Sequence, residues 1–132
     1  VQARETLEAA AKAGNYGEPK PKYVGRGVAM GDRPPGGGQS HAAVTLFPGG
    51  RVIFSTPIFE QGTGSYTLEM QVVAEELGIS KERIELEIWN TGNVDFDSGV
   101  GGSRVTRLGT QVAYAASENA KTELLKVSAD SD

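Results

Sequence analysis

The chain has 132 residues, a formal net charge of −4 and a pI near 5.0, so neither nucleic acid nor an anionic membrane is an expected partner. The absence of cysteine excludes disulfides, thiol catalysis and Fe–S ligation by this chain, and a single histidine, His41, excludes a His-based metal cluster or a Ser/His/Asp triad. We therefore expect no metal site in this chain. No apolar run approaches the roughly 20 residues of a membrane span.

The N-terminal part of the chain predicts a helix and an irregular connector. Residues 2–13 are rich in Ala, Glu and Lys, which favour helix, and Gly14 follows them. Because the apolar residues of this helix are mostly alanine, we expect it to pack lightly, or against a part of a larger protein. Residues 15–22 carry two prolines and are typical of a connector.

Three strands are predicted in the next part of the chain, at 23–32, 41–47 and 51–59. Pro48-Gly49-Gly50 separates the last two, which is a hairpin signal. The run Arg33 to Ser40 contains three successive glycines and predicts a flexible surface connection.

A helix is predicted from Tyr66, where the apolar spacing changes to that of a helical face. Its core-facing residues are expected to be Tyr66, Met70, Val73, Ala74 and Leu77, and its remaining positions include Glu69, Gln71, Glu75 and Glu76. Residues 84–88 alternate as a half-buried strand, and a second helix is predicted from Ser103 to about Lys126. The fold class is thus α+β: an antiparallel or mixed sheet of about four strands with two helices packed on one face.

We expect one domain over residues 1–132, with a core at 23–127 between the helix and connector of 1–22 and a polar tail at 128–132. Because the chain starts at Val1 without a methionine, we expect a piece of a larger protein.

Two Gly-rich stretches each open a predicted helix, and they are the candidate functional sites. The first is Glu60–Thr67 and the second is Gly99–Thr106. Backbone N–H groups at a helix start have no partner within the helix, and the helix dipole favours an anion there. Two such turns suggest one shared anionic ligand. The same composition is also ordinary turn and cap chemistry with no ligand.

In this order, the elements resemble part of the molybdenum-cofactor-binding subunit of the xanthine dehydrogenase/aldehyde oxidase family. The resemblance runs from Gly25 to about Leu125 and is firmest at Glu60–Thr67, Gln71–Ile79 and Gly101–Arg104. It implies that both turns contact the pterin cofactor, largely through backbone amides. The implied cofactor-binding residues are Gln61, Gly62, Thr63, Gly64, Gly101, Gly102, Ser103 and Arg104. This chain departs from the family pattern at three positions: most relatives have Gln at the position of Thr63, the residue at Gln61 is often Met, and the residue at Val105 is often Ser or Thr.

The resemblance further implies a cytoplasmic molybdenum hydroxylase, an oxidoreductase that inserts water-derived oxygen at a carbon of a small aromatic or aldehyde substrate. Its cofactor would be molybdopterin, as such or in its cytosine dinucleotide form. Its partners would be the remainder of the subunit and the Fe–S and FAD subunits or domains that receive the electrons. The family's catalytic glutamate lies in a later segment near a Gly-Glu-Pro sequence that we do not expect in this chain. We therefore expect no catalytic residue here, and the chain alone to be inactive and without cofactor.

The alternative interpretation belongs to another class of protein. In it, the chain is a self-standing, non-enzymatic module that binds a nucleotide or a protein partner through its Gly-rich helix starts.

Overall fold

The computed structural model describes residues 2–130, and the chain divides into two compact units, Val1–Pro34 and Pro35–Asp132. The first unit contains α1 (Ala3–Ala13), which has the predicted bounds to within one residue and no buried residue. From Val24 to Ala42 the chain forms neither helix nor strand, so the strand predicted at 23–32 is wrong. Alternating apolar residues become a strand only where another strand pairs with them, and the described residues supply no such partner for this stretch.

A three-stranded mixed sheet forms the centre of the second unit. Its strands are β1 (Ala43–Leu46), β2 (Val52–Thr56) and β3 (Ile84–Ile88), in the order β1-β2-β3. The hairpin partners β1 and β2 are antiparallel, whereas β2 and β3 are parallel. The α+β class is confirmed, with three strands among the described residues where about four were predicted. β3 is parallel to β2 because the helix between them carries the chain back along the sheet before it re-enters.

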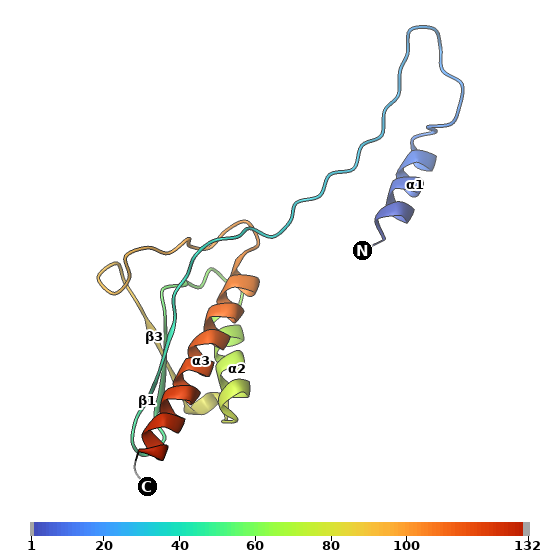
Figure 1. Ribbon diagram of the computed structural model, residues 1–132. Helices are drawn as coiled ribbons and strands as arrows, with labels where there is room; N and C mark the ends of the chain where they lie inside the picture. Colours follow the sequence, from blue (N-terminus) through green and yellow to red (C-terminus); the bar gives the residue numbers. More distant parts are fainter. Residues whose placement is uncertain (1, 131–132) are drawn as a thin grey trace. The chain divides into compact units, whose positions relative to one another are not determined.

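Two helices pack side by side on one face of this sheet (Figure 1). They are α2 (Ser65–Leu77) and α3 (Val105–Ala129), and a short 3₁₀ helix, η1 (Lys81–Arg83), precedes β3. Gly78 ends α2 with a left-handed φ of 64°. Because α3 continues to Ala129, the predicted tail at 128–132 begins inside the helix, and residues 131–132 of that tail lie outside the described residues.

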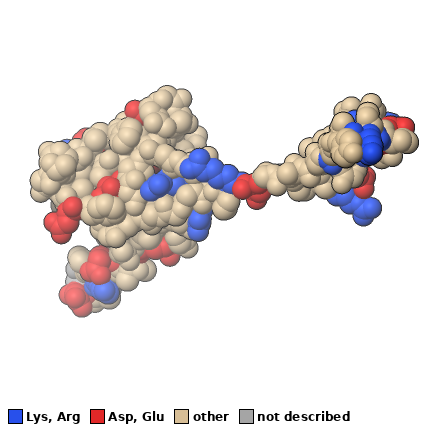
Figure 2. Space-filling view, turned by 90° about the horizontal axis from the view of Figure 1, so that it is seen from above, with Lys and Arg blue, Asp and Glu red and all other residues tan. Residues whose placement is uncertain are grey.

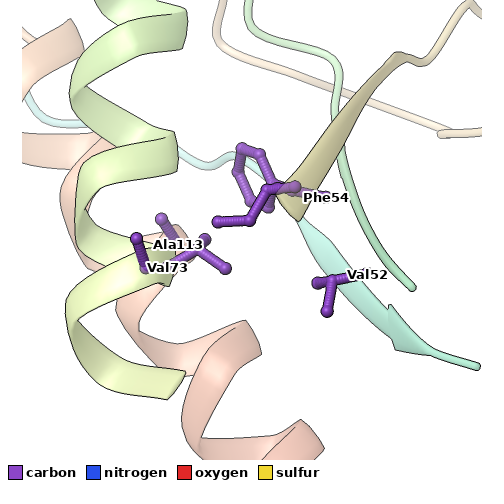
Figure 3. Packing of buried hydrophobic residues seen from close by; sticks show 6 residues of the cluster. Val52, Phe54, Val73 and Ala113 are labelled. Carbon is purple, nitrogen blue, oxygen red and sulfur yellow. The ribbon is translucent and has the colours of Figure 1, made fainter. Parts of the chain in front are cut away.

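The core lies between β2 and the two helices. Val52 and Phe54 are two residues apart on β2 and so share the face that meets Val73 of α2 and Ala113 of α3 (Figure 3). Phe54, Val73 and Ala113 have no exposed surface. Burying a side chain such as Phe54 contributes roughly 1.5–3 kcal/mol, which fixes the helix pair on the sheet.

The direction of the strands and helices brings the two Gly-rich turns to one end of this unit. The carboxyl ends of the parallel strands β2 and β3 lie at the same edge of the sheet, and each is followed by a Gly-rich turn and a helix. Both α2 and α3 therefore begin at that end (Figure 1). The helices also touch one turn into each, because Glu69 of α2 lies against Gly109 of α3.

Candidate functional site

The first turn is organised around the carboxylate of Glu60. Its Oε1 accepts hydrogen bonds from the backbone amides of Thr63 (2.6 Å) and Gly64 (3.0 Å). Oε1 also accepts the Thr63 hydroxyl at 3.3 Å, and Oε2 accepts the Ser65 hydroxyl at 3.1 Å. The chain thus supplies its own anion to the amides that precede α2.

These hydrogen bonds keep Glu60 ionised. Partial burial favours the neutral acid, but bonds from the amides of Thr63, Gly64 and Gly62 and from the Ser65 hydroxyl outweigh it and lower the pKa of Glu60 to about 2. A carboxylate that accepts several N–H groups is stabilised in its charged form. At neutral pH, a full negative charge therefore lies at the N-terminal end of α2.

The second turn, residues 99–104, has three successive amides without a protein acceptor, whereas the amide of Gly99 donates to Asp97 Oδ1 at 2.6 Å and that of Arg104 donates to the Gly101 carbonyl at 3.2 Å. Gly99, Gly102 and Ser103 all have left-handed φ values, of 65°, 59° and 58°. Within the part of the chain that the structure describes, the amides of Gly101, Gly102 and Ser103 donate to no protein group. Unpaired backbone N–H groups just before a helix can bind an anion.

Arg104 supports the second turn from within. Its Nε donates to the carbonyl of Gly101 at 3.0 Å, and its Nη1 donates to the carbonyl of Ser98 at 3.1 Å. Because the guanidinium binds the backbone of its own loop, Arg104 holds the shape of the turn. The planar fork of arginine suits two carbonyls at once.

The Gly-rich run before β1 packs against the second turn and is not the free surface connection predicted from the sequence. The amide of Gly36 donates to the carbonyl of Gly102 at 2.7 Å. The amide of Gln39 donates to the Ser98 hydroxyl at 2.7 Å, and the amide of Ser98 donates to the Gln39 carbonyl at 2.8 Å. A Cβ on Gly38 would lie 2.6 Å from the Ser98 Oγ, so only glycine allows this approach. Three successive glycines were the sequence signal for this contact.

A buried carboxyl group lies between the two helix starts. Glu69 has no exposed surface, and neither of its carboxyl oxygens has a hydrogen-bond partner of normal geometry in the described residues. Burial raises its pKa to about 7, against an opposing effect of the Thr56 hydroxyl and with a further increase from the charges of Asp97 and Glu60. The prediction that Glu69 lies away from the core is wrong, because the packing of α3 turns this position inward.

The predicted site residues divide between the two turns. Those of the first turn, Gln61, Gly62, Thr63 and Gly64, are exposed, as is Ser103, whereas Gly101, Gly102 and Arg104 are half-buried. Seen from this end, the second unit is mostly uncharged, with scattered Lys, Arg, Asp and Glu side chains (Figure 2). Over residues 2–130, no group of three or more acidic or histidine side chains could hold a metal ion. Nor is any described helix both long and apolar enough to cross a membrane.

A Gly-Glu-Pro sequence does occur in this chain, contrary to expectation. It is Gly17-Glu18-Pro19, in the exposed connector after α1. It precedes both Gly-rich turns, whereas the resemblance implied a catalytic segment that follows them.

The family model of the molybdopterin cofactor-binding domain matches residues 2–132. The chain belongs to this family. Over 93 residues it is 37% identical to the aldehyde oxidoreductase molybdenum-binding subunit PaoC of Escherichia coli O157:H7. It is 36% identical, also over 93 residues, to the subunit of the same name from Escherichia coli strain K12. Each match covers 70% of this chain, which spans 13% of the length of either relative.

Solved structures give the same family relationship. Quinoline 2-oxidoreductase from Pseudomonas putida 86 is similar with a TM-score of 0.56 and 25% identity, over 64% of this chain and 11% of that one. The carbon monoxide reduced state of the Cu,Mo-CO dehydrogenase is similar with a TM-score of 0.58 and 26% identity, over 92% of this chain and 17% of that one. The resemblance to a molybdopterin-binding subunit is thus confirmed, and the comparisons do not support a self-standing binding module.

Proposed function

We propose that this chain forms one part of the molybdopterin cradle in a molybdenum hydroxylase subunit. The observation that carries the proposal is the second turn, where three consecutive amides at a helix start have no protein acceptor. Membership of the molybdopterin cofactor-binding family supports an anionic pterin as their ligand. The parallel course of α2 and α3 supports a site that both turns border.

The second turn fits an anionic group of the cofactor. The amides of Gly101, Gly102 and Ser103 would donate to it, each charge-assisted bond contributing roughly 1.5–3 kcal/mol. Arg104 keeps the turn in shape. The first turn, Gln61–Gly64, borders the opposite side and carries the negative charge of Glu60.

The remaining parts of the activity belong to the longer protein. When bound, molybdopterin supplies the molybdenum centre at which oxygen is inserted into a small aromatic or aldehyde substrate. Fe–S and FAD subunits or domains would receive the electrons, and the remainder of the subunit would close the site. The proposal includes a cytoplasmic location and the cytosine dinucleotide form of the pterin.

Two matched glycine variants of the longer protein test this function. Gly102 and Gly78 have similar left-handed φ values, 59° and 64°, so Gly→Ala costs about 1–2 kcal/mol of backbone strain at either position. Gly102→Ala disturbs the proposed donors, whereas Gly78→Ala lies at the far end of α2. We expect stoichiometric molybdenum and pterin in the parent protein and in Gly78→Ala, and a clear loss of both in Gly102→Ala.

Elemental analysis for molybdenum and fluorescence of the oxidised pterin measure this result. Absence of molybdenum and pterin from the parent protein would contradict the proposed function. Equal cofactor content in the two variants would contradict the role of the second turn.

A further inference from the structure

Glu60 makes contacts that differ from those of an ordinary helix cap. A capping side chain accepts the amides of the second or third residue inside the helix. The Glu60 carboxylate instead accepts the amides of Thr63 and Gly64, which precede α2, and the hydroxyls of Thr63 and Ser65. It therefore closes the Gly-rich turn on itself, and two backbone donors of this turn are no longer free for a ligand.

We propose that Glu60 is a built-in anion that fixes the first turn and directs an incoming anionic group to the second. This inference rests on the proposed function and changes how the two turns share the ligand. The turns differ in their free amides: Glu60 occupies those of Thr63 and Gly64, whereas Asp97 accepts only the amide of Gly99 (2.6 Å) and leaves those of Gly101–Ser103 free. Glu60 is thus a positioning residue, which acts on the ligand through the turn and through its charge.

The hydrogen bonding at the two helix starts supports this division. α2 and α3 begin at the same end of the sheet and touch at Glu69 and Gly109, one helical turn from each start. Neither helix has an acidic side chain in its first turn, but a carboxylate is hydrogen-bonded to the turn ahead of each, Glu60 before α2 and Asp97, through the amide of Gly99, before α3. An anion near both helix starts is repelled by either carboxylate, so the free amides of Gly101–Ser103 decide that it binds at the second turn.

Two substitutions separate the two roles of Glu60, its hydrogen bonds to the turn and its negative charge. Glu60→Gln keeps an oxygen acceptor for the amides of Thr63 and Gly64 but removes the charge, and Glu60→Ala removes both. Glu82→Gln is the matched control, because Glu82 is an exposed glutamate that accepts a hydroxyl bond, from Ser80, in η1 before β3. The measurement is a titration of the 132-residue chain with inorganic pyrophosphate at low salt, followed by the NMR shifts of single backbone amides.

In the wild-type chain, we expect pyrophosphate to shift the amide resonances of Gly101, Gly102 and Ser103. The amide resonances of Thr63 and Gly64 should stay unchanged. Glu60→Gln should bind pyrophosphate roughly three- to tenfold more tightly at the second turn, because one repelling charge is gone. In Glu60→Ala, the amides of Thr63 and Gly64 should respond as well. Glu82→Gln should behave as the wild type.

The outcomes distinguish this inference from the function on which it rests. If Thr63 and Gly64 respond in the wild type as strongly as the second turn, the cradle stands and the role of Glu60 is overturned. Unchanged affinity in Glu60→Gln overturns the same role. If pyrophosphate shifts the amide resonances of neither turn in any variant, the proposed anion-binding cradle is contradicted, and the inference about Glu60 is contradicted with it.

Discussion

The Oε1 atom of Glu69 lies 2.6 Å from the point that a Cβ on Gly109 would occupy, so a buried carboxyl group of α2 rests directly on the backbone of α3. Gly109 is fully buried within α3, where glycine is otherwise a poor helix former. The contact explains the glycine, because any side chain there would need the space that the carboxyl group occupies. It also sets how closely the two helices, and hence the two Gly-rich turns, approach each other.

Gly109→Ala should destabilise the chain. Alanine gains about 1 kcal/mol of helix propensity, but its Cβ would lie 2.6 Å from Oε1 and 3.1 Å from Cδ of Glu69, and a buried side chain has little room to move. We expect a net loss of about 1–2 kcal/mol in the free energy of unfolding, measured by urea denaturation. In the Glu69→Ala background the same substitution should be neutral or stabilising. A loss of equal size in both backgrounds would show that the clash is not with Glu69.

Glu69→Gln should remove a pH dependence of stability between about pH 4.5 and 7. Folding raises the pKa of Glu69 from 4.5 to about 7, so its contribution is fully present below pH 4.5 and is lost as the pH rises through 7. A shift of this size corresponds to about 3 kcal/mol. We expect the glutamine variant to exceed the wild type in unfolding free energy at pH 8, with a smaller or reversed difference at pH 5. Parallel pH profiles of the two proteins would contradict the raised pKa.

Local patterns were sufficient to predict the elements whose signals are strong along the chain. The helical spacing from Tyr66 predicted the start of α2 to within one residue, and the alternation at 84–88 predicted β3 with its observed bounds. The stretch 23–32 failed because a strand depends on a pairing partner that no local pattern describes. The parallel pairing of β2 and β3 was also not visible in local patterns, because it follows from the path of α2 over the sheet.

The site was only partly predictable, because its charges depend on contacts between distant residues. The two Gly-rich turns were visible in the sequence, and their position at one end of the sheet agrees with the expectation of a shared site. Glu60 was part of the first motif, but its bonds back to Thr63 and Gly64 require the turn geometry. Glu69 was placed on the polar side because glutamate is rarely buried without a partner. A glycine at position 109, on the facing helix, is what makes room for it.

Arg104→Lys should loosen the second turn although it retains the positive charge. Lysine cannot reproduce the two bonds that the guanidinium donates to the carbonyls of Ser98 and Gly101. Amide hydrogen exchange of Gly36, Ser98 and Gly99, whose amides are hydrogen-bonded at this loop, should accelerate about tenfold, which corresponds to the loss of roughly 1.4 kcal/mol of local stability. Arg107→Lys is the control, because Arg107 is exposed in the first turn of α3. Equal exchange in the two variants would mean that charge alone maintains the turn.

Glu60→Gln should lower the stability of the chain at neutral pH and have less effect in acid. The pKa of Glu60 is lowered from 4.5 to about 2 on folding, so its stabilising contribution is present above pH 4.5 and is lost as the pH falls through 2. This window lies below that of Glu69, where the sign is opposite, so the two carboxyl groups can be separated by pH. The difference in unfolding free energy between wild type and Glu60→Gln should therefore shrink steadily from pH 5 to pH 2.5 in urea denaturation series. Glu75→Gln, an exposed change on the same helix, should leave a difference that does not vary in this way. If the Glu60→Gln difference were constant with pH, the carboxylate would not hold the turn through its charge, and the amides of Thr63 and Gly64 would be open to a ligand.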